Sequence, residues 1–230
     1  MTMKKTWSVL WMTLFCMLLA APAALAADGA EAAKIDTGDT AWVLISAALV
    51  FIMTPGLGFF YGGMVRSKNV LTTIMQSFFI VAMVSVEWVI LGYAMTFGAD
   101  INGFIGSLDK IGLAGVGMNV LENGTIPELA FVAFQCMFAV ITPALIIGAF
   151  AERINFKGFL IFTLLWSLLV YNPVAHWVWS ADGWLFKLGA LDFAGGTVVH
   201  VNAGIAAIVT AIMLGKRRDY EGHALPPHNI

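Results

Sequence analysis

The sequence has little charge and none of the common catalytic or nucleotide-binding patterns. Only 11% of the 230 residues are charged and the formal net charge is −2, whereas about a quarter of residues are charged in soluble domains. Lysine and arginine occur in separate short segments and form no single basic patch, which excludes nucleic acid as a partner. The absence of a nucleophile–base pair, a phosphate-binding loop and a metal-ligand cluster argues against an enzyme, a metal site and a cofactor.

Cysteine is also scarce, with only Cys16 and Cys136 in the chain. Cys16 lies in a segment typical of a secretory signal, which combines a basic start, an apolar stretch and a small-residue cleavage site: Lys4-Lys5, 7–20 and Ala24-Leu25-Ala26. We predict cleavage after Ala26, so that residues 1–26 are a signal peptide; an uncleaved first membrane helix is the alternative. The mature chain then holds one cysteine and no intramolecular disulfide.

Hydrophobic residues make up 60% of the chain and the mean hydropathy is +0.87, values typical of a polytopic membrane protein. Residues 27–40 are small and polar, and we expect them to form a periplasmic N-terminus. Five apolar stretches follow, each long enough to cross a bilayer as a helix: 42–64, 70–97, 129–150, 156–179 and 193–214. We therefore expect an all-α transmembrane bundle over 41–217, with 98–127 as its longest connection and a truncated cytoplasmic loop over 218–230.

The basic residues beside these stretches predict the orientation of the chain. Seven fall on one side, Arg66, Lys68, Arg153, Lys157, Lys216, Arg217 and Arg218, and three on the other, Lys34, Lys110 and Lys187. Because basic residues favour the cytoplasmic side, the mature N-terminus is expected outside and the C-terminal tail inside. Export of the N-terminus agrees with the signal peptide.

Five spans are an odd number, and the sequence ends in a loop-like segment, 226–230. We expect them to be the first member of an inverted repeat, in which a site lies where two halves meet. Glycines in the first and fifth spans, most of which we expect to allow close helix packing, are Gly56, Gly58, Gly62, Gly63, Gly195, Gly196 and Gly204.

Two ionisable residues lie on a glycine-rich frame in the fifth stretch. Asp192 precedes His200 by eight residues, which is roughly 12 Å along a helix. An ionisable side chain among membrane helices indicates a pathway for ions or protons. A buried, hydrogen-bonded histidine is the structural alternative for His200. Asp192 is expected to cap the helix and is also placed to set the charge of a vestibule.

Aromatic residues cluster in the third and fourth stretches. Phe134 and Phe138 are one helical turn apart, and Trp177 and Trp179 end the fourth stretch. From pattern alone the phenylalanine pair is core or lipid-facing, and the tryptophans belong to an interfacial belt.

These runs, DFAGGTVVHVNAG at 192–204, FQCMFA at 134–139, TPALIIGAFAER at 142–153 and YNPVAHWVW at 171–179, together resemble the ammonium transporter family over about 42–229. The resemblance implies an outer cation-recruiting site at Trp179 and Phe138, with Phe134 as a second ring. It also implies a pore in which His200 is the first of two histidines, Asp192 is the vestibule aspartate, and Gln135 and Tyr171 are pore-adjacent.

The resemblance further implies uptake of ammonium, with deprotonation in the pore, across a bacterial inner membrane by a homotrimer. A PII-type signal protein on the cytoplasmic face is expected as a partner. Family members have about eleven spans, of which five are expected here. Three alternatives stay open: an ammonium sensor, a Rhesus-type channel for neutral ammonia, and a half-transporter with no activity of its own.

Overall fold

The computed structural model describes residues 34–121, 124–217, 220 and 226–229, all within the unit Ala33–Ile230, so the expected signal peptide lies outside the described residues. Within the described residues, five helical segments are long and apolar enough to cross a membrane: Thr37–Met64, Ser67–Phe97, Glu128–Phe150, Phe156–Lys187 and Gly196–Leu214. The predicted all-α, multi-pass membrane bundle is confirmed.

Two of the spans are single uninterrupted helices, α2 (Thr37–Met64) and α5 (Glu128–Phe150). Helix α2 begins before the apolar stretch predicted to start at 42, because Asp36 caps it. The Asp36 carboxylate accepts the backbone N–H of Asp39 at 2.9 Å, which satisfies one of the free donors of the first turn. Polar residues at the start of a span are therefore helical here.

The other three spans each contain a short π-helix. The second runs through η1 (Ser67–Asn69), α3 (Val70–Glu87), the π-helix η2 (Trp88–Gly92) and α4 (Tyr93–Phe97). The fourth consists of α6 (Phe156–Trp166), the π-helix η4 (Ser167–Tyr171), α7 (Asn172–Trp179) and, after a turn, α8 (Trp184–Lys187). The fifth is the π-helix η5 (Gly196–Val201) followed by α9 (Asn202–Leu214). Such one-turn π segments often mark functional positions.

The fifth span starts later than predicted. The expected start at 193 is wrong because Gly195 adopts a left-handed conformation, with φ of +80°, and the helix begins at the next residue. A Cβ on Gly195 would lie 2.4 Å from a methyl carbon of Val199, so both the backbone angle and the space require glycine.

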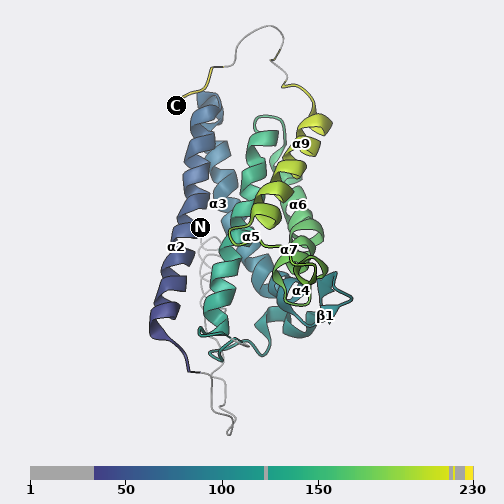
Figure 1. Ribbon diagram of the computed structural model, residues 1–230. Helices are drawn as coiled ribbons and strands as arrows, with labels where there is room; N and C mark the ends of the chain where they lie inside the picture. The colour runs from purple at the N-terminus through teal and green to yellow at the C-terminus, as the bar shows by residue number, and fades with distance from the viewer. Residues whose placement is uncertain (1–33, 122–123, 218–219, 221–225, 230) are drawn as a thin grey trace, which may run out of the picture. The chain divides into compact units, whose positions relative to one another are not determined.

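The long connection 98–127 contains structure that the sequence did not indicate. A short antiparallel hairpin pairs β1 (Asp100–Ile101) with β2 (Ile105–Gly106), and the 3-10 segment η3 (Leu108–Leu113) follows. The hairpin lies beside the ends of α4 and α7 (Figure 1). We call this end of the bundle, which also carries Trp179, the Asp100 end.

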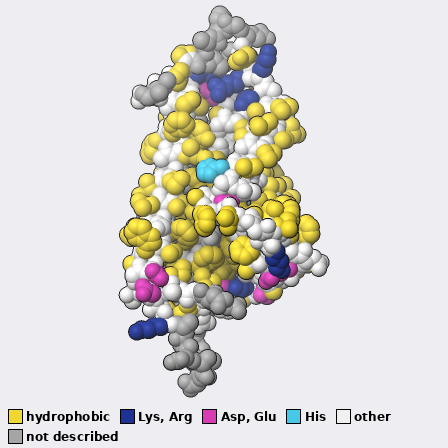
Figure 2. Space-filling view, viewed as in Figure 1, with side chains coloured by type: hydrophobic (Ala, Val, Ile, Leu, Met, Phe, Trp, Pro, Cys, Tyr) yellow, Lys and Arg dark blue, Asp and Glu magenta, His cyan; other side chains and the backbone are white. Residues whose placement is uncertain are grey.

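Helix α5 is the centre of the core. Figure 1 shows α2, α3 and α9 beside it, and all three pack against it. In its apolar stretch 67% of residues are buried, compared with 17% in α2 and 17% in the fifth span, Gly196–Leu214. Hydrophobic side chains cover much of the face seen in Figure 2, and charged side chains gather towards its two ends. This distribution is typical of a bundle surrounded by lipid.

Only some of the glycines serve close packing. A Cβ on Gly58 would lie 3.1 Å from Ser77, and one on Gly62 would lie 2.9 Å from Ile74, so both allow α2 to approach α3. The packing role expected of Gly56 and Gly204 is wrong for the described residues, because neither has a neighbour within 4 Å of a built Cβ.

The opposite end of the bundle, the Glu152 end, is tied by one carboxylate. Glu152 Oε1 accepts from Arg66 Nε at 3.1 Å and Asn69 Nδ2 at 2.6 Å, and Oε2 lies 3.2 Å from Arg217. We call these four residues the Glu152 cluster. Burial would raise the pKa of Glu152, but the bonds from Asn69 and Arg66 outweigh it and hold the pKa below its usual value. The cluster joins the α2–α3 connection, the α5–α6 connection and the end of α9.

Candidate functional site

The aromatic residues singled out in the sequence meet at the Asp100 end. The rings of Phe134 and Phe138, one turn apart on α5, are 5.0 Å apart between centroids and nearly perpendicular. The Phe138 ring lies 5.6 Å from that of Trp179, at the end of α7. All three side chains are half-buried, so their exposed faces remain open to a bound group. We call these three residues the aromatic site.

Asp192 joins this site to the start of the fifth span. Trp179 Nε1 donates to the Asp192 backbone carbonyl at 2.8 Å. The Asp192 carboxylate accepts three backbone N–H groups of η5: Oδ1 from Gly196 at 2.7 Å, and Oδ2 from Thr197 at 2.8 Å and Val198 at 3.0 Å. The predicted capping contact is therefore present, although Gly195 and not Asp192 is the N-cap residue. One residue thus fixes both an aromatic ring and a helix start.

His200 lies in η5, one turn beyond the backbone groups that Asp192 caps. Its side chain is exposed, and its ring makes no hydrogen bond to the described residues. Its exposed neighbours on this span are the polar Thr197 and the apolar Val201, Ile205 and Ile208, of which the last three are 53%, 60% and 62% accessible. Among the described residues, His200 is therefore not buried. The imidazole stands on a face that is apolar apart from Thr197.

Gln135 and Tyr171 lie deeper in the bundle than the aromatic site. Tyr171, in η4, is fully buried, and Gln135, on α5, is 9% exposed. Gln135 Oε1 has no hydrogen-bond partner among the described residues. The structure therefore places both residues in the core beside the aromatic site, and neither shares the exposed face of His200.

A buried acid near the middle of the second span went unrecognised in the sequence. Glu87 is 5% exposed and accepts from Asn172 Nδ2 at 2.7 Å and from Ser167 Oγ at 3.2 Å. Within the described residues it pairs with no lysine, arginine or histidine. Glu87 could have been identified from the sequence, because it is an isolated acidic residue in an apolar stretch.

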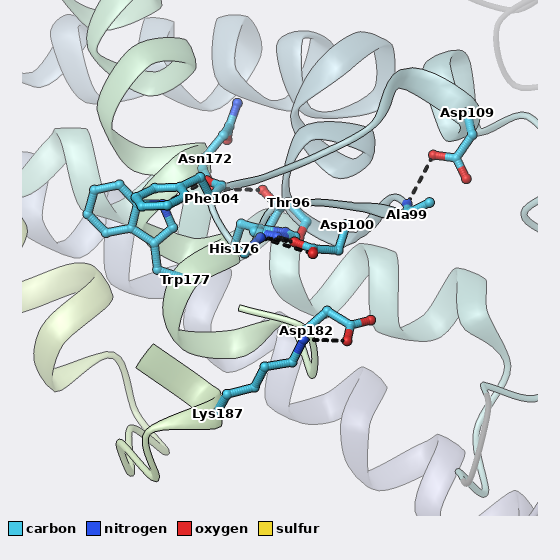
Figure 3. Close-up of polar contacts among 11 residues, drawn as sticks. Thr96, Ala99, Asp100, Phe104, Asp109, Asn172, His176, Trp177, Asp182 and Lys187 are labelled. Carbon is cyan, nitrogen blue, oxygen red and sulfur yellow. Dashed lines mark hydrogen bonds and ion pairs between the residues drawn. The ribbon is translucent and has the colours of Figure 1, made fainter. Parts of the chain in front are cut away.

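A second unrecognised group is the pair formed by His176 and Asp100. Figure 3 shows the His176 ring between Thr96 and Asp100, with Asn172 and Trp177 on the same helix. Nδ1 is 2.7 Å from the Thr96 carbonyl oxygen, and Nε2 is 2.9 Å from Asp100 Oδ1. The bond from His176 holds the pKa of the Asp100 carboxyl below its usual value.

The chemistry available at this end is that of cation binding and proton handling. Aromatic faces attract small cations through their π electrons, and a neutral imidazole both donates and accepts a proton. Among the described residues no group of three or more His, Cys, Asp or Glu is placed to hold a metal ion.

Comparison with known proteins identifies the family of the chain. A sequence model of the Ammonium Transporter Family matches residues 41–230. A protein named ammonium transporter from Bacillus subtilis (strain 168) is 55% identical over 194 residues, covering 84% of this chain and 47% of that protein. A protein with the same name from Aquifex aeolicus (strain VF5) is 50% identical over 203 residues, covering 87% of this chain and 47% of its own length. The chain thus spans about half the length of these curated relatives.

Solved structures give the same result for the fold. The crystal structure of Candida albicans Mep2 superposes with a TM-score of 0.78 at 35% identity, covering 85% of this chain and 44% of Mep2. A structure described as a sensor Amt protein superposes with a TM-score of 0.75 at 31% identity, covering 83% of this chain and 49% of its own. The five spans follow the fold of these proteins, and the chain belongs to the Ammonium Transporter Family.

Proposed function

We propose that this chain carries the recruiting site and one wall of the pore of an ammonium transporter. The observation that supports this most is the junction at Asp192. Its carbonyl holds the Trp179 ring beside Phe138, and its carboxylate caps the helix that carries His200. The place where a cation would be bound and the place where its proton would be handled are therefore joined by one residue.

Recruitment and conduction need separate chemistry. A small cation over the rings of Trp179 and Phe138 gains about 2 kcal/mol when partly desolvated. The idealised cost of moving a bare ion into the hydrocarbon is of order 20 kcal/mol, so the rings alone cannot carry a charged ion across. The aromatic site concentrates ammonium at the entrance, and a later step must remove the charge.

Deprotonation removes that charge. Ammonium, unlike potassium, can give up a proton and cross as small neutral ammonia. The proton crosses separately along the same path, so each ammonium ion still carries one charge across the membrane. His200 is suited to receive and relay that proton because a neutral imidazole accepts at one nitrogen and donates at the other. Its exposed face, flanked by Val201 and Ile205, forms one wall of the path. We propose that polypeptide outside these five spans supplies the facing wall.

The placement in the membrane is part of the same proposal. The Asp100 end faces outside and the Glu152 end faces the cytoplasm, as the excess of basic residues at the Glu152 end favours. The transporter then lies in a bacterial inner membrane as a homotrimer, with a periplasmic mature N-terminus. A PII-type signal protein binds the Glu152 end. Chemical cross-linking of membranes and protease accessibility of the N-terminus test assembly and orientation.

The recruiting role is tested by replacing Trp179 in the complete protein expressed from its own gene. Ammonium-evoked current is measured in proteoliposomes for Trp179→Leu and for Trp42→Leu, a control on α2 where Trp42 is 74% exposed. Loss of about 2 kcal/mol raises the half-saturating ammonium concentration about 30-fold for Trp179→Leu, and the control leaves it unchanged. Equal half-saturation in both variants would contradict the recruiting role.

A sensor is the second candidate function, because one structural neighbour is described as a sensor Amt protein. The current assay separates the candidates. A transporter passes charge with each ammonium ion, a Rhesus-type channel passes neutral ammonia without current, and a sensor binds ammonium with little flux.

A further inference from the structure

The ring of His176 is held by two acceptors at once. Its Nδ1 faces the Thr96 carbonyl at 2.7 Å and its Nε2 faces Asp100 Oδ1 at 2.9 Å (Figure 3). A carbonyl cannot donate, and the Asp100 carboxylate already accepts the Gly103 N–H, at 2.8 Å to Oδ1 and 2.9 Å to Oδ2. A neutral imidazole carries a single N–H and can donate to only one of these acceptors, whereas a doubly protonated ring can donate to both.

The His176 ring is fully buried, so a positive charge on it would need a partner. The His176 side chain is 0% exposed and that of Asp100 is 21% exposed. A charge taken out of water is costly unless an opposite charge and hydrogen bonds compensate for it. The other charged groups nearby, Asp182 and Lys187, form an exposed ion pair at 3.0 Å. Asp100 is therefore the carboxylate placed to compensate a charge on the His176 ring.

The pair connects the hairpin to the helix that carries Trp179. The same hairpin accepts the Trp177 indole N–H at the Phe104 carbonyl, 2.7 Å away. One turn earlier on α7, Asn172 donates to Glu87. His176 and Asn172 are four residues apart, so both bonds lie on one face of α7 and resist its rotation. The hairpin and the second span therefore fix how α7 is turned.

Trp179 lies one turn beyond His176 on the same helix. A rotation of α7 that released His176 would carry the Trp179 ring away from Phe138 and from the Asp192 carbonyl. The turn after α7 leaves little room for adjustment, since a Cβ on Gly183 would lie 2.2 Å from the His176 carbonyl oxygen. The position of the recruiting ring thus depends on the His176 contacts.

We infer that Asp100 and His176 form a charged positioning pair that sets the affinity of the aromatic site for its cation. The inference rests on the proposed recruiting function for its transport readout. Neither residue touches the substrate; both act through the orientation of α7. This role is distinct from that of His200, which lies on a different span and handles the proton.

The charge state is tested first, in a way that does not depend on transport. The complete protein is labelled with 15N-histidine, and its ring nitrogens are observed by NMR at pH 7, with His176→Gln identifying the His176 signals. Two protonated ring nitrogens support the pair. A neutral ring, with one unprotonated nitrogen, would overturn it whatever the transport assays show.

The positioning role is tested by current measurements on His176→Ala, Asp100→Asn and the double variant, with Asp182→Asn as the matched control. We expect about a tenfold rise in half-saturating concentration, smaller than for loss of the Trp179 ring, with the maximal current nearly unchanged. The double variant should equal the singles because the residues act as one unit. His176→Gln, whose amide can donate one hydrogen bond to Asp100, should restore part of the affinity.

Unchanged half-saturation in folded His176→Ala, or additive losses in the double variant, would overturn the positioning role. If Trp179→Leu also leaves half-saturation unchanged, the proposed recruiting function has failed, and the NMR result still decides the charge state of the pair. If His176→Ala does not fold, His176→Gln and Asp100→Asn carry the transport test.

Discussion

Each end of the bundle is tied by one carboxylate, and the two carboxylates are held differently. Glu152 is 1% exposed and is bound by Arg66 and Asn69 from the α2–α3 connection and by Arg217 from the end of α9. Asp100 is 21% exposed and binds one histidine on one helix. A carboxylate with several cationic partners holds separate segments together, whereas a carboxylate with one partner orients that partner. We therefore expect stability to depend more on the Glu152 end and substrate affinity more on the Asp100 end.

The largest effect on stability is expected from Glu152→Gln. It removes the buried carboxylate charge that Arg66 and Arg217 both contact, and removing one member of a largely buried ion pair costs about 3 kcal/mol. Thermal unfolding of the complete protein in detergent measures it, with Asp182→Asn, in an exposed pair, as the control. If Glu152→Gln melted at the same temperature as the control, stability would not depend more on the Glu152 end than on the Asp100 end.

The Glu152 contribution should depend on pH with a definite sign. The pKa of Glu152 is lowered in the folded protein, so its stabilisation is fully present above the unfolded value of about 4.3 and is lost as the pH falls through the folded pKa. The melting temperatures of the native protein and Glu152→Gln should therefore converge in acid. A gap that stays constant from pH 7 to pH 3 would contradict this account.

An intermediate effect is expected from Asp192→Ala. It removes the acceptor of three η5 backbone N–H groups, and loss of a helix cap costs about 1 to 2 kcal/mol. Asp192→Asn keeps one acceptor oxygen and should lose less. Both melting temperature and ammonium-evoked current are measured, and we expect the current to fall in Asp192→Ala because η5 carries His200. If a stable Asp192→Ala protein kept a normal current, transport would not depend on the cap that Asp192 provides.

The smallest effect is expected from Lys110→Met at the Asp100 end. Lys110 Nζ lies 2.6 Å from Glu128 Oε1, but the pair is partly exposed and Tyr93 also donates to Glu128. Exposed pairs contribute at most about 1 kcal/mol. If Lys110→Met lost as much stability as Glu152→Gln, the stability of the protein would depend on the Asp100 end as well.

Much of the architecture follows from the sequence because membrane spans are long and apolar. The five stretches and the capping contact of Asp192 were predicted from local pattern, and the grouping of Phe134, Phe138 and Trp179 followed from family resemblance. The start of the fifth span was wrong because hydropathy does not detect the left-handed Gly195. Local sequence patterns predict single helices and their caps, and they do not predict contacts between distant segments.

The contacts that sequence reasoning missed are those between distant segments. Glu87 meets Asn172 across 85 residues, and Asp100 meets His176 across 76. Neither partner of such a pair is recognisable alone, since a histidine near the end of a span is as consistent with packing as with pairing. The π-helices were missed for a related reason: their register is set by packing between spans.

In the proposed function, His200 handles the proton that ammonium must lose. The most direct measurement is the ammonium-evoked current, with potassium as the competing ion, of His200→Ala and of Ile212→Ala, an exposed control on the same span. We predict that His200→Ala loses the current or its discrimination against potassium, and that the control keeps both. Unchanged current and selectivity in His200→Ala would contradict the account.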